Sequence, residues 1–257
     1  MNGDPESCCV TRAVTDGLPV IEVCSLGAVP YLTALETQRH LVAARQSGRI
    51  HDRLLLLEHP AVITVGVSGR ASRDHVVATP AELQDRGIEI LDVRRGGDVT
   101  YHGPGQLVGY PVIDLKPDRC DVRRYVRDIE EVLISTVAAF GVEAGRVSGL
   151  TGVWVGREKL AAIGVRLSRW VTSHGFALNV TTNLAHFDLI VPCGLQGYGV
   201  TSLERLLGTA PARYDLDAVL AGEFGRVFGR RVAARGESPA SHRERRSNAA
   251  ATLTTSC

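Results

Sequence analysis

The stretch of residues 94–111 constrains the fold more than any other part of the chain. It reads RRGGDVTYHGPGQLVGYP, with five glycines and two prolines around a Tyr-His pair. Glycine lets a backbone approach a ligand closely, and proline favours tight turns. Because the stretch passes directly into an apolar run, we expect a backbone wrapped around a ligand. The alternative is an ordinary long loop between strands.

Composition excludes several classes of protein. The 257 residues are 44% hydrophobic and 5% aromatic, with a formal net charge of +1. This balance indicates a globular protein. It lacks the excess of positive charge that would attract nucleic acid or a membrane surface. No apolar run reaches the ~18 residues that span a bilayer. Asp4 and Glu6 stand where a signal peptide would be positively charged, so we expect a cytoplasmic protein.

The cysteines fit no metal-binding pattern. Six are present, at positions 8, 9, 24, 120, 193 and 257. No pair forms a CxxC motif and no histidine stands at zinc-finger spacing, so we expect no metal site. Reduced thiols in a reducing compartment fit this usage best. Each cysteine can then be either inert or catalytic.

Hydrophobic patterning predicts one domain over residues 19–232, with disordered extensions at 1–18 and 233–257. We expect strands at residues 20–25, 53–58, 61–66, 88–93, 107–115, 152–155, 159–168 and 170–180. We expect helices at residues 30–47, 79–87, 121–141, 202–207 and 216–228. Helices and strands do not alternate strictly, which predicts an α/β fold with a mixed sheet flanked by helices.

Two helices carry distinct sequence signals. In residues 121–141, apolar side chains recur every three or four positions, with Arg and Glu on the other side. Asp121 should cap this helix and Gly141 should end it. In residues 30–47, Leu32, Leu35 and Val42 predict the buried face.

Cys193 is a candidate nucleophile. It stands in the sequence Val-Pro-Cys-Gly-Leu at residues 191–195. Proline fixes the backbone before it and glycine permits a sharp bend after it, which suits a thiol held at the tip of a turn. The alternative is a small buried cysteine, the usual state of a reduced one.

Lys159 is a candidate proton-transfer group. It begins an apolar run, and a lysine drawn into a desolvated site has a lowered pKa. The chain holds only two lysines, Lys116 and Lys159, beside many arginines. Lysine can lose its proton where arginine cannot, which favours a chemical role. The alternative is a solvated lysine in a turn.

The run of residues 173–179, Ser-His-Gly-Phe-Ala-Leu-Asn, would let a ligand approach a strand through its small side chains. Its histidine, His174, can equally be a core histidine with its hydrogen bonds satisfied. Both interpretations stay open.

Several blocks together resemble the signature of the octanoyltransferases, the lipoyl(octanoyl) transferases that begin lipoate assembly. The blocks are residues 95–106, Lys159 with 162–164, residues 174–179 and residues 191–195. The resemblance covers about residues 20 to 230, in the same block order.

The resemblance implies a fold like that of the biotin and lipoate protein ligase catalytic domains. It implies transfer of an octanoyl or lipoyl group from acyl carrier protein to one lysine of a lipoyl domain. Such domains occur in 2-oxoacid dehydrogenase E2 subunits and in the glycine cleavage H protein. By position, Cys193 would form the acyl thioester and Lys159 would lower its pKa and act as general base. We expect a monomer that needs no cofactor.

The resemblance also implies the walls of the substrate site. They are Arg95, Gly96, Gly97, Asp98, Val99, Thr100, Tyr101, His102, Ala162, Ile163, Gly164, Gly175, Phe176 and Ala177. We expect an apolar tunnel closed by Tyr101, His102 or Phe176.

Two other functions compete. An ATP-dependent ligase of the lipoate or biotin type would activate the acid as an adenylate and would not need a cysteine on a turn. A binding module without catalysis would recognise carrier protein or lipoyl domains only. The presence of both Cys193 and Lys159 favours the transferase.

Overall fold

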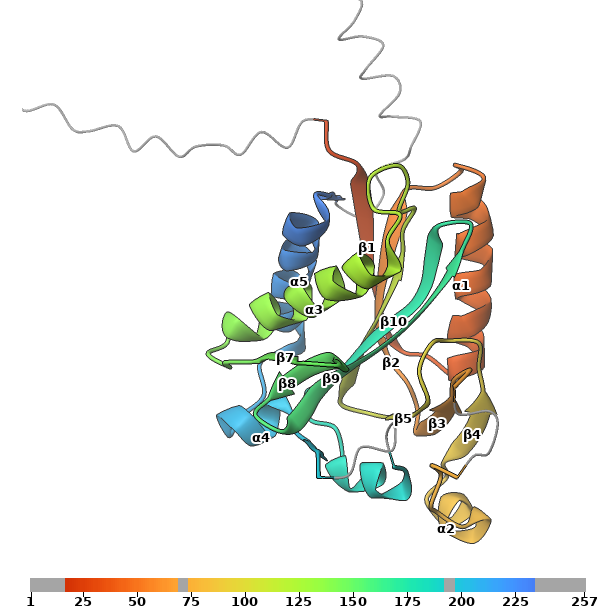
Figure 1. The fold of residues 1–257 in the computed structure, drawn as a ribbon, viewed down its shortest axis with the longest axis vertical. Coiled ribbons are helices and arrows are strands. Elements are labelled where there is room, and N and C mark those ends of the chain that lie inside the picture. Colours follow the sequence, from red (N-terminus) through yellow and green to blue (C-terminus); the bar gives the residue numbers. More distant parts are fainter. Residues whose placement is uncertain (1–16, 69–73, 192–196, 234–257) are drawn as a thin grey trace, which may run out of the picture.

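The computed structural model describes residues 17–68, 74–191 and 197–233 (Figure 1). The elements in chain order are β1 (Val20–Ala28), α1 (Tyr31–Gln46), β2 (Asp52–Glu58), β3 (Val62–Val65), α2 (Pro80–Asp85), β4 (Glu89–Asp92), β5 (Val99–His102), β6 (Gln106–Val112), α3 (Val122–Ala138), β7 (Gly145–Val147), β8 (Leu150–Val155), β9 (Glu158–Ser168), β10 (Val171–Asn179), the 3-10 helix η1 (Leu184–Leu189), β11 (Gly199–Val200), α4 (Leu203–Leu207), α5 (Arg213–Phe228) and β12 (Arg231–Ala233).

The strands form a large mixed sheet and a small one. The large sheet has the order β12-β1-β2-β6-β10-β9-β8-β7, with β11 beside β9. Its first three strands are parallel and the path from β2 to β7 is antiparallel, while β11 is parallel to β9. The small sheet has the order β4-β3-β5. The prediction of a mixed sheet is therefore confirmed.

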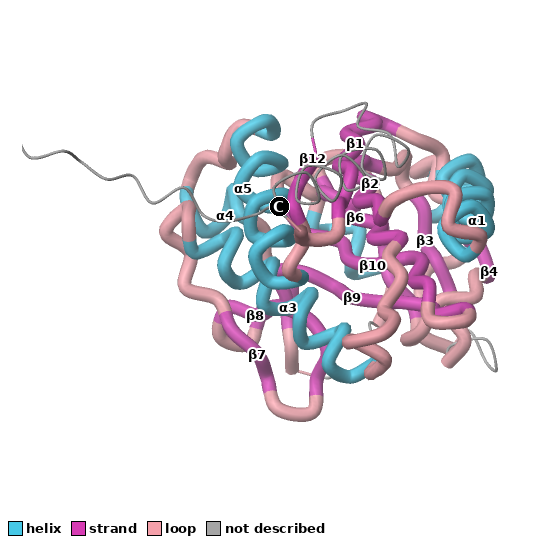
Figure 2. Tube along the Cα trace, turned by 90° about the horizontal axis from the view of Figure 1, so that it is seen from above, coloured by secondary structure: helices cyan, strands magenta, loops and turns pink. Residues whose placement is uncertain are grey.

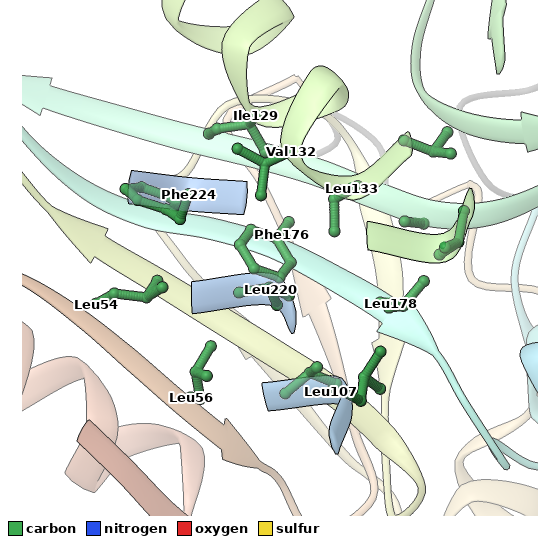
Figure 3. Packing of buried hydrophobic residues seen from close by; sticks show 14 of the residues in the cluster. Leu54, Leu56, Leu107, Ile129, Val132, Leu133, Phe176, Leu178, Leu220 and Phe224 are labelled. Carbon is green, nitrogen blue, oxygen red and sulfur yellow. The ribbon is translucent and has the colours of Figure 1, made fainter. Parts of the chain in front are cut away.

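Helices cover both faces of the large sheet. Figure 2 shows α1 on one side of the strands and α3 with α5 on the other. Strand β2 contributes side chains to the core on both sides of the sheet. Leu54 and Leu56 pack with α3 and α5 (Figure 3). Leu55 and Leu57 pack with residues of α1. The strand is therefore buried on both faces, because successive side chains along it point to opposite sides of the sheet.

Helix ends agree with the sequence signals. The Asp121 side chain accepts hydrogen bonds from the backbone N–H groups of Arg123 and Arg124, so it caps α3 as predicted. The capping box of Thr79 and Glu82 begins α2.

The buried face of α1 was predicted wrongly. Leu32 is 58% exposed, whereas Tyr31, Ala34 and Gln38 are buried. The physical reason is a polar contact: Gln38 Oε1 accepts the backbone N–H of His174 on β10 at 2.7 Å. Gln38 therefore faces the sheet, while Leu35 and Val42 are half-buried beside it.

Some elements had no clear sequence signal. Strand β5 lies inside the glycine-rich stretch, and β7, β11 and β12 have only two or three residues each. The predicted extensions fall almost wholly outside the described residues, so their disorder stays a prediction. Within the described part of the chain, no helix is long and apolar enough to cross a bilayer.

Candidate active site

A cavity of about 450 Å³ lies over strands β6, β9 and β10 and beneath residues 95–100. Every substrate-binding residue implied by the sequence lines it except Tyr101: Arg95, Gly96, Gly97, Asp98, Val99, Thr100, His102, Ala162, Ile163, Gly164, Gly175, Phe176 and Ala177. Lys159 lines it as well. Residues as far apart in the chain as Arg95 and Ala177 therefore meet at one cavity.

Tyr101 lies in the neighbouring core. Its hydroxyl is 2.7 Å from His186 Nδ1, and its ring contacts Phe187 edge to face at 5.5 Å between centroids. It belongs to the hydrophobic cluster under the small sheet and is 1% exposed. The structure thus brings His102 and Phe176 to the cavity, but not Tyr101.

Glycines let the loop lie close to the sheet. Gly164 on β9 pairs with Gly175 on β10. A Cβ atom on Gly164 would come within 2.9 Å of the Gly96 carbonyl oxygen and 3.2 Å of Arg95 Cδ. The Gly96 N–H also donates to the Val165 carbonyl at 3.0 Å, which ties the loop to β9. Close backbone approach explains why this position carries no side chain.

Arg95 is a buried cation in the cavity wall, 7% exposed. Its Nη2 donates to the Thr64 carbonyl oxygen at 2.7 Å, and its Nε donates to Thr64 Oγ1 at 3.2 Å. Its Nη1 donates to the Gly96 carbonyl oxygen at 3.1 Å. These bonds fix the guanidinium on β3 of the small sheet, so its charge has a defined place beside the cavity.

Lys159 sits at the start of β9. Its Nζ lies over the Trp154 ring, 4.8 Å from the centroid, in a cation–π contact. The residue is partly buried, and its backbone pairs with Val200 on the parallel strand β11. An amine lining a cavity suits the role that the sequence implied for it.

Cys193 lies outside the described residues. The chain on either side of it is held by backbone contacts, and on one side these lie at the cavity. Val191 donates its N–H to the His75 carbonyl at 2.8 Å, and Val200 pairs with Lys159 and lines the cavity. The pairing of Cys193 with Lys159 stays a prediction that these anchors favour.

Three buried histidines lie at or next to the cavity, and burial is the main cause that lowers the pKa of each. It lowers the pKa of His102 to about 3, with His59 and Arg95 adding to the effect. The pKa values of His59 and His174 are lowered to about 4. All three rings are therefore neutral at pH 7.

His174 is both a buried core histidine and a residue of the cavity wall, the two interpretations left open by the sequence. It is 2% exposed, as a core histidine would be, yet it lines the cavity. Its Nδ1 has no hydrogen-bond partner among the described residues, and its backbone has a φ of 55°. A non-glycine residue in the left-handed region is strained, and such strain is common at functional sites.

A chain of side-chain amides fixes His102. Gln106 Nε2 donates to Asn179 Oδ1 at 2.9 Å, so its Oε1 is free to accept from His102 Nδ1 at 2.8 Å. Asn179 Nδ2 in turn donates to the Thr201 carbonyl at 3.0 Å. Gln106 and Asn179 belong to the sequence blocks quoted above, but their roles were missed because nothing local predicts that they meet.

Asp98 contacts His75, a residue that the sequence analysis did not identify. Its Oδ2 accepts a short hydrogen bond from His75 Nδ1, while its Oδ1 is buried without a partner in the described structure. His75 stands far from any quoted block, and the sequence around it carries no signal. Among the described residues, no three His, Cys, Asp or Glu side chains gather as metal ligands.

Comparisons with known proteins identify the family. A family model described as the lipoyl protein ligase A/B catalytic domain matches residues 30–225. The chain belongs to this family. An octanoyltransferase from Acidobacterium capsulatum is 52% identical over 229 residues, covering 83% of this chain and 92% of the relative. One from Myxococcus xanthus is 50% identical over 214 residues, covering 81% of this chain and 59% of that longer relative, less than two thirds of its length.

Solved structures agree on the fold of this family. A lipoate-protein ligase A bound with ATP has a TM-score of 0.64 at 14% identity, covering 85% of this chain and 90% of the other. A bipartite lipoate protein ligase from Thermoplasma acidophilum has a TM-score of 0.59 at 15% identity, covering 85% of this chain and 88% of its own. The predicted ligase-like fold is confirmed, and the named relatives support octanoyl transfer in lipoylation.

Proposed function

We propose that this chain transfers an octanoyl group from acyl carrier protein to a lysine of a lipoyl domain, through a thioester on Cys193. One observation carries the proposal: Lys159 lines the cavity and pairs with Val200, at one end of the segment that holds Cys193. The octanoyltransferase relatives, about half identical to this chain, support the same activity.

The first step forms the acyl-enzyme. The Cys193 thiolate attacks the thioester carbonyl of the donor, a new C–S bond forms, and the carrier thiol leaves with the proton that Cys193 gave up. A thiol with a pKa near 8.5 is only slightly ionised at neutral pH, so the positive charge of Lys159 would favour the thiolate.

The second step forms the amide. Acylation of Cys193 removes the negative charge beside Lys159, so its ammonium loses a proton more easily. The neutral amine of Lys159 takes a proton from the incoming substrate lysine as that lysine attacks the thioester. The C–S bond then breaks and Cys193 leaves as a thiolate. Because the acyl group starts as a thioester, the sequence of steps consumes no ATP.

The cavity suits an alkyl chain. Burying the six methylenes of octanoyl contributes about 5 kcal/mol at ~0.8 kcal/mol each. Apolar or small side chains, among them Val99, Ala162, Ile163 and Phe176, line the space.

Intact-mass measurement tests the proposal. The protein is incubated with octanoyl carrier protein without ATP, and we expect one octanoyl adduct that maps to Cys193. The Cys193→Ser variant should carry no thioester, whereas Cys120→Ser, which removes an exposed thiol, should acylate normally. An octanoyl adduct that maps to another residue, or lipoylation that requires ATP, would overturn the proposal.

A further inference from the structure

The cavity has an open end and a closed end. Gly97, Val122, Gly149 and Thr151 line it and are exposed to solvent. At the other end its lining residues are almost fully buried. They are Tyr31, His102, Tyr110 and His174, which are 5%, 6%, 4% and 2% exposed.

Aromatic rings close the buried end. The ring of Tyr31 lies 5.9 Å from that of His102 and 5.0 Å from that of His59, between centroids. Tyr110 lies 5.8 Å from His59 and 6.3 Å from His174. We name these five residues the ring cluster.

Hydrogen bonds hold the ring cluster in place. His59 Nδ1 donates to the Val29 carbonyl at 2.6 Å, which leaves His59 Nε2 to accept the Tyr110 hydroxyl at 2.8 Å. His102 Nδ1 donates to Gln106 Oε1. Moving one ring would break a buried hydrogen bond, and such a loss is costly because no water replaces the partner.

The ring cluster suits the end of an apolar chain. Its histidines are neutral at pH 7, and its tyrosines stay protonated because burial raises the pKa of Tyr31 to about 12. It presents ring faces and edges without a charge, against which a methyl group can pack at little cost.

We propose that the ring cluster limits the length of the acyl chain that the enzyme accepts. This proposal rests on the proposed function. A longer chain must displace a ring that hydrogen bonds and neighbouring rings hold, whereas a shorter chain only leaves apolar surface uncovered. Tyr31 is the member to test, because it lies at the first turn of α1 and its ring packs beside those of His59 and His102.

Chain-length profiles test the proposal. The rate of adduct formation on Cys193 is measured with hexanoyl, octanoyl, decanoyl and dodecanoyl carrier protein. We expect Tyr31→Ala to raise the dodecanoyl-to-octanoyl rate ratio by about tenfold or more. The control is Leu150→Ala, which shortens an apolar side chain at the other end of the cavity and should leave that ratio unchanged. Tyr31→Leu serves if thermal melting shows that Tyr31→Ala is unfolded.

The outcomes separate the two proposals. A wild-type protein that acylates with none of the chains refutes the proposed function. A wild-type protein that forms the octanoyl adduct, with an unchanged ratio in folded Tyr31→Ala or Tyr31→Leu, refutes the ring cluster as the limit. A ratio that changes in Leu150→Ala instead would place the chain end at the opposite side of the cavity.

Discussion

Lys159 on β9 lies opposite Val200 on β11, and Val200 follows Cys193 by seven residues. The pairing joins the lysine to the segment that holds the proposed nucleophile. The other end of that segment is held as well, because Val191 donates to the His75 carbonyl. This arrangement favours the proposed pairing of Lys159 with Cys193, which stays a prediction.

Replacing Lys159 separates its charge from its ability to lose a proton. Lys159→Arg keeps the cation that favours the Cys193 thiolate, but arginine cannot serve as a base at neutral pH. We expect transfer to the substrate lysine to slow by about 100-fold or more, while acylation of Cys193 slows less. Single-turnover assays of each half-reaction measure the two rates.

Lys116→Arg is the matched control, since Lys116 is the other lysine of the chain and its side chain is 54% exposed. It should leave both rates unchanged. If Lys159→Arg slows both half-reactions equally, the general-base role is wrong and Lys159 acts in another way.

A methyl group on Gly164 would push the loop away from the sheet. In Gly164→Ala the new Cβ would lie 2.9 Å from the Gly96 carbonyl and 3.2 Å from Arg95 Cδ. Because residues 95–100 form one wall of the cavity, we expect octanoyl transfer to fall at least tenfold, with about 1–3 kcal/mol of lost stability from the close contact. Steady-state kinetics and chemical denaturation measure the two effects.

Gly222→Ala provides the comparison. Gly222 lies on the exposed side of α5, and a Cβ there meets nothing within 4 Å. Alanine should stabilise this helix by about 0.5–1 kcal/mol and leave activity unchanged. Activity that survives in Gly164→Ala would show that the loop can shift without harm.

Much of the site could be predicted from sequence because its residues stand in compact blocks. Gly164 and Gly175 are informative locally, since glycines inside apolar strands mark a close approach of backbone or ligand. The residues that were missed act across the fold. Tyr31 reaches the cavity only because α1 packs on β10, which no periodicity in its own segment reveals.

Helix α3 also shows that sequence periodicity does not reveal contacts made across the fold. Its apolar stripe predicted the buried face correctly, with Ile129 and Leu133 in the core. The sequence assigned its glutamates to the polar side, yet Glu130 is 1% exposed. Partners from outside the helix, Arg146 and the backbone of Gly152, make this burial possible, and helical periodicity carries no information about them.

The neutral histidines predict how stability depends on pH. The pKa values of His59, His102 and His174 are lowered to about 3 to 4 in the folded protein, against an ordinary value of 6.5. Below pH 6.5 the unfolded chain therefore binds protons that the folded chain does not. The free energy of unfolding should fall from pH 6.5 toward pH 5, by about 1 kcal/mol per pH unit for each histidine.

Chemical denaturation across that range measures the slope. His59→Gln should reduce the slope, although it also lowers stability at every pH. His40→Gln removes an imidazole from the exposed side of α1 and should leave the slope as it is. Equal slopes in the wild type and His59→Gln would show that His59 is protonated in the folded state.

Glu130 joins α3 to the hairpin at the mouth of the cavity. Its carboxylate pairs with Arg127 at 2.7 Å and Arg146 at 3.0 Å, and its Oε1 accepts the buried N–H of Gly152 at 3.1 Å. Glu130→Ala leaves that N–H without its acceptor, which costs about 1–3 kcal/mol. Because Gly149, Leu150 and Thr151 line the cavity just before Gly152, we also expect a raised KM for the acyl donor.

Its neighbour Glu131 is the matched control, because it pairs with the same Arg146 at 2.8 Å but its side chain is 44% exposed. An exposed pair contributes about 0–1 kcal/mol, so Glu131→Ala should change the unfolding free energy and the KM little. Chemical denaturation of both variants measures the unfolding free energy, and titration with the acyl donor measures the KM. Equal losses in the two variants would mean that the Arg146 ion pairs, and not the buried bond to Gly152, hold the hairpin on α3.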